Sequence, residues 1–223
     1  MTSCLVIDCS GQVISVALAR DGAGADAGIW SETLEQKHGQ AEALAPLAER
    51  VFQRSSLNDW TELEHVVVCR GPGGFTGLRI GVAFALGLTA GAPHVKLWGM
   101  ATDAYWLSQL SQRKVAGDRP LICAVDTRRD DFYWKDLNAV VTDWMIAASV
   151  DDLPAAYADA LFVGNAPMAR DHLDDTQHWC EEIDTAYVAQ ASLDPSYRSA
   201  YLADDTTPLY VRAPAISKAN RVS

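Results

Sequence analysis

The chain has 223 residues, and its hydrophobic share of 49% is enough for one large domain or two small lobes with packed cores. Its formal net charge of −11 disfavours direct nucleic-acid binding, because such binding depends on Lys and Arg neutralising phosphates. No uncharged apolar stretch reaches the ~18 residues of a membrane helix, since Arg79 interrupts the longest, Phe75 to Ala90. We therefore expect a cytoplasmic protein without a signal peptide or a membrane contact.

The cysteines and histidines do not form a metal-binding pattern. The five cysteines are scattered, with no pair at the close spacing of a zinc knuckle or a redox motif. No two of the five histidines stand four residues apart, as a metal pair on one helix face would require. We predict no metal site, and we expect the cysteines to be reduced core residues.

The first elements predicted are three strands. Cys4 to Asp8 is a short apolar run, and Val13 to Arg20 alternates apolar with small or polar residues after a turn at Ser10-Gly11. This pattern predicts a strand, a tight turn and an antiparallel strand. A third strand is expected at Gly28 to Glu32.

A helix and then a strand–loop–helix unit follow. Apolar residues recur at helical spacing from Gly39 to Arg54, with Pro46 as a local disturbance, which predicts an amphipathic helix. His65 to Arg70 is apolar without alternation, as in a strand covered on both faces. It leads directly into the glycine loop Gly71 to Gly74 and a second helix.

The second half repeats the plan of the first. Leu121 to Asp126 is again an apolar strand that ends in aspartate, and Asp131 to Leu137 returns as a second strand, so Asp126 corresponds to Asp8. Self-similarity over so long an interval favours a duplicated α/β domain over a solenoid.

The remaining elements complete a division into two lobes. A helix is expected at Ala101 to Gln112 and a last helix at Asp184 to Leu202, and the tail from Pro208 is expected to be extended. We place the lobe boundary near Met100, which gives a first lobe of residues 1–100 and a second of residues 101–223 with a tail that packs back.

The glycine loop before the second helix has two interpretations. Backbone N–H groups of such a loop, together with the positive end of the helix dipole, can hold an anion. The loop is not a P-loop, because the Lys-Ser or Lys-Thr pair is absent. A tight structural turn explains it equally well.

The helix after the loop contains three glycines, Gly77, Gly81 and Gly87, and each costs ~1 kcal/mol relative to alanine. Gly77, Gly81 and Ala85 are spaced four apart and form a smooth stripe that a helix backbone could approach closely. The neighbour could belong to the same lobe or to a second chain, and both alternatives stay open. Arg79 in this apolar helix must reach solvent, a carboxylate or backbone carbonyls.

The glycine segment resembles the signature of the bacterial TsaB family, also called YeaZ. The matching residues are Gly71-Pro72-Gly73-Gly74-Phe75-Thr76-Gly77-Leu78-Arg79-Ile80-Gly81, with support from Ile7-Asp8-Cys9-Ser10, Val125-Asp126-Thr127-Arg128 and the tail Pro208-Leu209-Tyr210-Val211-Arg212. The resemblance implies an α/β fold of the actin-like, Hsp70-like ATPase class (ASKHA), with two duplicated lobes of mixed sheets flanked by helices.

The resemblance also implies a function. Proteins of this family take part in making N6-threonylcarbamoyladenosine (t6A) at position 37 of tRNAs that read ANN codons. They act as a non-catalytic partner of the catalytic subunit TsaD, which the ATPase TsaE joins, and they form homodimers when the partner is absent. We therefore expect this chain to meet tRNA only indirectly and to have no catalytic residue and no cofactor of its own. ATP and Mg²⁺ are left open for the assembled complex.

Two sets of candidate residues follow from the resemblance. The expected partner interface consists of His38, Ala41, Leu44, Ala48, Thr76, Gly77, Ile80, Gly81, Phe84 and Leu86. The alternative function, an ATP-binding kinase-like protein or weak ATPase, would use Asp8, Ser10, Gly73, Gly74 and Asp126.

Two segments depart from the expected patterns. Charged residues crowd Thr127-Arg128-Arg129-Asp130, where a small loop with glycine is expected, and each aspartate could simply cap a turn. Trp98-Gly99-Met100 replaces small polar residues that are usual in the family.

Overall fold

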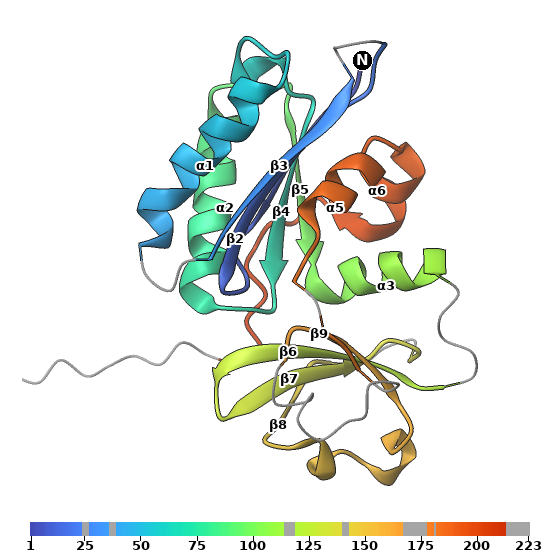
Figure 1. Cartoon of the computed structure of the whole chain (residues 1–223). Coiled ribbons are helices and arrows are strands. Elements are labelled where there is room, and N and C mark those ends of the chain that lie inside the picture. The colour runs from blue at the N-terminus through green and yellow to red at the C-terminus, as the bar shows by residue number, and fades with distance from the viewer. Residues whose placement is uncertain are drawn as a thin grey trace, which may run out of the picture.

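The computed structural model describes residues 1–23, 27–35, 39–113, 119–139, 143–166, 178–180 and 182–212. They form two mixed β-sheets, and helices cover both faces of the first (Figure 1). The first sheet has the order β11-β5-β4-β1-β2-β3 and the second has the order β10-β9-β6-β7-β8.

The bounds of the elements are as follows. The first sheet contains β1 (Ser3–Asp8), β2 (Val13–Arg20), β3 (Gly28–Glu35), β4 (His65–Gly71), β5 (Lys96–Ala101) and β11 (Leu202–Ala203). The second contains β6 (Leu121–Arg129), β7 (Asp131–Asp136), β8 (Met145–Ala147), β9 (Leu161–Gly164) and β10 (His178–Cys180). The helices are α1 (Gln40–Arg54), α2 (Phe75–Ala90), α3 (Thr102–Arg113), α5 (Thr185–Ala191) and α6 (Pro195–Tyr201), with short 3₁₀ turns at Trp60–Glu62, Val150–Asp152 and Ala155–Tyr157.

The two sheets share one plan, as the sequence predicts. In the first sheet, β1 pairs with β2 in antiparallel and with β4 in parallel orientation. In the second, β6 pairs in the same way with β7 and β9. The duplicated α/β architecture is therefore confirmed.

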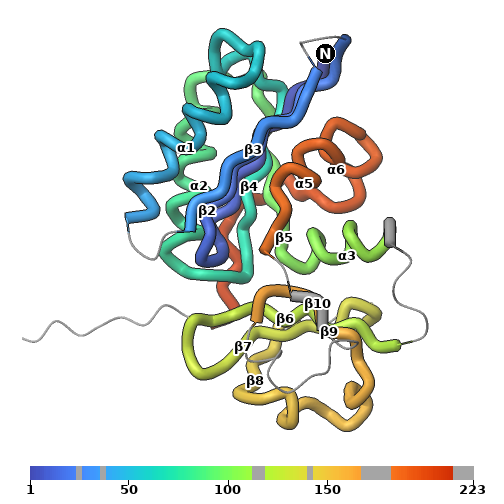
Figure 2. The backbone as a smooth tube through the Cα atoms, in the orientation of Figure 1, coloured from blue at the N-terminus to red at the C-terminus, as the bar shows by residue number. Residues whose placement is uncertain are grey.

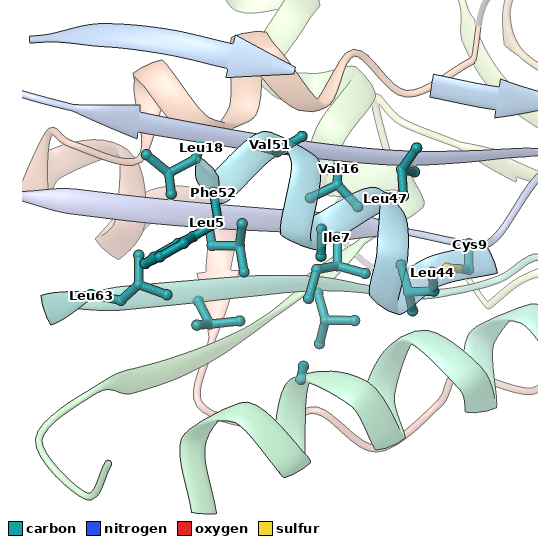
Figure 3. Close-up of a cluster of buried hydrophobic side chains, with 14 of the residues drawn as sticks. Leu5, Ile7, Cys9, Val16, Leu18, Leu44, Leu47, Val51, Phe52 and Leu63 are labelled. Atoms are coloured by element: carbon teal, nitrogen blue, oxygen red, sulfur yellow. The ribbon is translucent and has the colours of Figure 1, made fainter. Parts of the chain in front are cut away.

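The first sheet separates two hydrophobic cores. The helices α1 and α2 cover one face, and α3, α5 and α6 cover the other (Figures 1 and 2). Leu5 and Ile7 of β1 point to the α1 side, where Leu44, Leu47 and Val51 meet them (Figure 3). Because β1 is covered on both faces, all of its residues are buried.

The glycines of α2 serve the packing of this helix on its own sheet. A Cβ atom added to Gly77 would lie 1.9 Å from the backbone oxygen of Cys9, so only glycine fits there. At Gly81 an added Cβ would make ordinary contact, at 3.5 Å, with Val68, and at Gly87 it would meet nothing within 4 Å. The smooth stripe of Gly77, Gly81 and Ala85 thus faces a neighbour within the lobe.

The C-terminal elements return to the first sheet. The second sheet consists of β6 to β10 only, whereas α5 packs on β1 and β2, and β11 pairs with β5. The division into residues 1–100 and 101–223 therefore does not follow the two sheets. The expected packing of the tail is visible in the hydrogen bond from the Leu209 N–H to the Arg70 oxygen, at 2.7 Å.

Two local predictions differ from the structure. The single last helix predicted from Asp184 to Leu202 is wrong, because Asp194 and Pro195 start a second helix: the Asp194 side chain accepts from the Ser196 N–H and Pro195 occupies the first turn. The strand β5 is not predicted, because Gly99 interrupts its short apolar pattern.

The burial of the cysteines agrees with their expected role. Cys4, Cys9, Cys69 and Cys123 are free thiols inside the two cores, and burial raises the pKa of Cys4 to about 12. Within the described ranges, no helix combines the length and apolar character needed to cross a membrane.

Candidate functional site

The five candidate nucleotide-binding residues lie where the two sheets meet. Asp8 ends β1, and the Ser10 oxygen after it accepts a hydrogen bond of 2.7 Å from the N–H of Gly74, the residue before α2. Gly73 packs equally closely, because a Cβ there would lie 2.7 Å from the Ser10 Cβ. Asp126 lies in β6 of the second sheet, and Arg128, two residues after it, contacts Gly11 in the turn after β1. We call this place the inter-sheet junction.

Each aspartate of the junction caps a turn, the role that the sequence interpretation allows. One Asp8 carboxylate oxygen accepts from the Ser10 N–H at 2.9 Å, and one Asp126 oxygen accepts from the Arg128 N–H at 2.7 Å. Among the described residues, no group of three or more His, Cys, Asp or Glu side chains is arranged to hold a metal ion.

Arg128 fills the space in front of the glycine loop. Its backbone has a left-handed φ of 59°, which is uncommon for a residue with a side chain. Its guanidinium donates to the Gly11 oxygen and lies beside Gly74, where an added Cβ would be 3.1 Å from its Cζ atom. The Arg128 guanidinium, from the second sheet, therefore lies at the N-terminus of α2. This is the position where the helix dipole would stabilise a bound phosphate.

Two acids compensate the Arg128 charge. Burial raises the pKa of Asp8, whose side chain is almost fully enclosed, and Arg128 opposes that rise. Burial likewise raises the pKa of Glu182, with a further contribution from the Asp8 charge. The Asn165 amide reaches the Glu182 carboxylate at 3.5 Å. Sequence reasoning identified the crowded charge around Arg128 but missed Glu182, which no local pattern marks.

The predicted interface residues fall into two groups. Ala41, Thr76 and Leu86 are exposed, with Leu86 at 49%, and Ile80 and Phe84 are half-buried. The other described members are buried inside the chain's own core: Leu44, Ala48, Gly77 and Gly81. These four residues are buried against the first sheet, so neither the Leu44 and Ala48 side chains nor the two glycine backbones are exposed to a partner. His38 lies outside the described residues.

We call the outer sides of α1 and α2 the α1–α2 face and define it by the predicted members Ala41, Thr76, Ile80 and Leu86 together with the exposed Gly87. A hollow of about 360 Å³ lies on it, between the starts of the two helices, and its lining includes Gly39, Gln40, Thr76 and Arg128. The hollow thus joins the α1–α2 face to the inter-sheet junction. Inside it the Gln40 amide nitrogen is buried without a hydrogen-bond partner.

The C-terminal segment holds the first turns of α2. The Arg79 Nε–H donates to the Tyr210 hydroxyl at 2.9 Å, and its Cζ atom lies 3.9 Å from the centre of the Phe75 ring. The Phe75 and Tyr210 rings pack with their centroids 4.9 Å apart. Arg79 is thus exposed and satisfied by aromatic groups rather than by a carboxylate.

Comparison with known proteins identifies similar sequences and folds. The family model described as "TsaD: tRNA N6-adenosine threonylcarbamoyltransferase" matches residues 21–170. A protein of Escherichia coli named tRNA threonylcarbamoyladenosine biosynthesis protein TsaB is 31% identical over 132 residues, which is 59% of this chain and 53% of that relative. The protein of the same name from Haemophilus influenzae is 28% identical over 138 residues, covering 60% of this chain and 52% of the relative. The chain therefore spans about half the length of these curated relatives.

Two solved structures share the whole fold. YeaZ from Pseudomonas aeruginosa aligns with a TM-score of 0.68 at 18% identity, covering 95% of this chain and 100% of the other. A second structure, described as similar to peptidase YeaZ from the same organism, aligns with a TM-score of 0.70 at 18% identity and the same coverage. The actin-like fold expected from the sequence is confirmed by these alignments and by the family model.

Proposed function

The chain belongs to the TsaD family of tRNA N6-adenosine threonylcarbamoyltransferases, and from that premise we propose that it is a non-catalytic partner subunit of the complex that forms t6A at position 37 of tRNA. Two curated relatives carry the name tRNA threonylcarbamoyladenosine biosynthesis protein TsaB, which supports this role. In this proposal the chain pairs with a TsaD-type catalytic subunit, and a TsaE-type ATPase joins the pair.

The observation that carries the proposal is the uncovered α1–α2 face. Leu86 exposes 49% of its surface, and the space beside Gly87 is open, so an apolar helix flank faces solvent. Exposed Ala41, Ala45 and Ala83 widen this small-residue surface. A partner helix could approach such a surface closely and bury it, which is the usual meaning of an exposed apolar patch.

Charge and the inter-sheet junction support a non-catalytic role. A net charge of −11 disfavours direct binding of tRNA, so in this proposal the other subunits hold the tRNA. Arg128 stands at the glycine loop, where a nucleotide phosphate would have to displace it or pair with it. In the absence of the catalytic partner, the same face could pair two copies of this chain.

The proposal is tested by pairing with a TsaD-type subunit, measured by sedimentation. Leu86→Glu puts a charge on the exposed side of α2 that the partner would bury, and desolvating it should weaken the heterodimer at least about a hundredfold. Leu107→Glu is the matched control, because Leu107 is an exposed leucine on α3, on the other side of the sheet. Equal pairing by both variants would contradict the proposed interface.

An ATPase or kinase activity of the chain alone is the competing function. The observation in its favour is that Asp8, Asp126 and the glycine loop do meet at one junction. Pure protein should show no ATP turnover if the partner role is correct. Turnover that Asp8→Ala abolishes would favour the competing function.

A further inference from the structure

Trp98 of β5 borders a hollow that the partner role does not use. The hollow has a volume of about 420 Å³ and lies between the β4–β5 edge and α6. Its lining includes His65, Trp98, Arg198, Ser199, Leu202 and Asp204. We call it the Trp98 hollow. It belongs to the face of the first sheet that is opposite to α1 and α2.

The aromatic wall of the Trp98 hollow is fixed in place. The Trp98 indole N–H donates to the Nδ1 atom of His65 at 3.2 Å. Gly99 next to it allows close packing of the C-terminal segment, because an added Cβ would lie 2.1 Å from the Asp205 oxygen. The ring is therefore held by a side-chain hydrogen bond and by the backbone geometry of β5.

The polar groups of the Trp98 hollow are mainly hydrogen-bond donors. Because the His65 Nδ1 atom accepts from Trp98, the neutral ring carries its hydrogen on Nε2, which is a donor. Burial lowers the pKa of His65, and Arg198 lowers it further, against a weaker opposing effect of Glu64. The imidazole is thus a neutral donor, and the Ser199 hydroxyl at the rim adds a second polar group.

Arg198 supplies a cation that has no carboxylate at ion-pair distance in the part of the chain that the structure describes. Its Nη1 atom donates to the backbone oxygens of Ser192 and of Leu193, the latter at 3.0 Å, which orients the guanidinium. Asp204, the acid of the hollow, is paired with Lys96 at 2.7 Å. The Lys96 ammonium also lies 5.0 Å from the centre of the Trp98 ring. Because Lys96 pairs with the one acid in the described lining of the hollow, the Arg198 charge remains available beside an aromatic face.

We propose that the Trp98 hollow binds a small molecule that carries a flat ring and one anionic group. The ring packs on Trp98 and Leu202, and the anion pairs with Arg198, with the His65 Nε2–H as an additional donor. A fixed aromatic wall with a few convergent polar groups, in a volume of a few hundred Å³, is typical of small-molecule sites.

The test uses the full chain and three probes in isothermal titration. Adenosine 5′-monophosphate carries ring and anion, adenosine carries the ring alone, and inorganic phosphate carries the anion alone. The monophosphate should bind saturably and at least about tenfold more tightly than either fragment probe, because both contacts contribute. It should also shift the indole N–H signal of Trp98 in a nitrogen–proton spectrum, assigned with Trp98→Phe.

A pair of charge variants locates the site. Ser199→Asp adds a negative charge at the rim and should weaken binding of the monophosphate at least about tenfold. Ser31→Asp is the control, since it adds the same charge to an exposed serine of β3, at the opposite edge of the first sheet, and should change the affinity less than about twofold.

A second pair of variants addresses the charge of the hollow. Arg198→Gln should also weaken binding at least about tenfold, whereas Arg119→Gln should leave the affinity within about twofold. Arg119 is a fair control because it too donates to backbone oxygens, those of Asp159 and Ala160. The proposal is overturned if the monophosphate binds no better than its fragments, leaves the Trp98 signal unchanged, or binds Ser199→Asp as tightly as the original chain.

Discussion

Adding one methyl group at each of the three glycines of α2 tests how this helix packs. In Gly77→Ala the new Cβ would lie 1.9 Å from the Cys9 backbone oxygen, which no side-chain rotation can relieve. Overpacking against backbone costs about 3 kcal/mol, and alanine returns about 1 kcal/mol of helix propensity. We expect the free energy of unfolding to fall by about 2 kcal/mol.

The other two glycines are internal controls. At Gly87 the added methyl group meets nothing within 4 Å, so Gly87→Ala should raise the free energy of unfolding by about 1 kcal/mol. At Gly81 the contact of 3.5 Å is ordinary, and Gly81→Ala should be neutral or gain up to about 1 kcal/mol. Urea unfolding followed by circular dichroism measures all three. If Gly77→Ala were as stable as Gly87→Ala, the close packing of α2 on β1 would be refuted.

Two further substitutions test the tail and the inter-sheet junction. Tyr210→Phe removes the acceptor of Arg79 but keeps the ring contact with Phe75. The free energy of unfolding, measured by urea titration, should fall by about 1 kcal/mol. An unchanged free energy of unfolding would contradict the tail contact. Burial raises the pKa of Asp8 above its ordinary value of 3.8, so the folded state favours the protonated carboxyl. The resulting contribution to the free energy of unfolding is fully present below pH 3.8 and is lost as the pH rises through the raised pKa. Asp8→Asn should therefore gain stability relative to the original chain between pH 4 and pH 8, and a constant difference across this range would contradict that reasoning.

The sequence predicts the elements whose patterns are local and regular. The alternation in Val13 to Arg20, the helical spacing of α1 and the glycine loop before α2 each have one physical interpretation, and the structure agrees with them. The family resemblance and the repeat of Asp8 at Asp126 together predict the duplicated fold. Both aspartates cap turns because a carboxylate after a strand is well placed to accept the N–H two residues later.

The sequence cannot predict features that depend on distant contacts. Helical spacing shows that Leu44 and Gly81 lie on a smooth or apolar flank, but it does not tell whether that flank meets the chain's own sheet or a partner. The return of α5 and α6 to the first sheet is set by long-range contacts rather than by their own sequence. For the same reason Glu182 enters the inter-sheet junction without any local signal.

The most direct test of the proposed function is a reconstituted tRNA threonylcarbamoylation assay. It combines the TsaD-type catalytic subunit, the TsaE-type ATPase and the enzyme that forms the carbamoyl-adenylate, with and without this chain. We expect modified tRNA only when the chain is present, none from the chain alone, and a loss of product with Leu86→Glu but not with Leu107→Glu. Equal product without the chain would contradict the proposed subunit role.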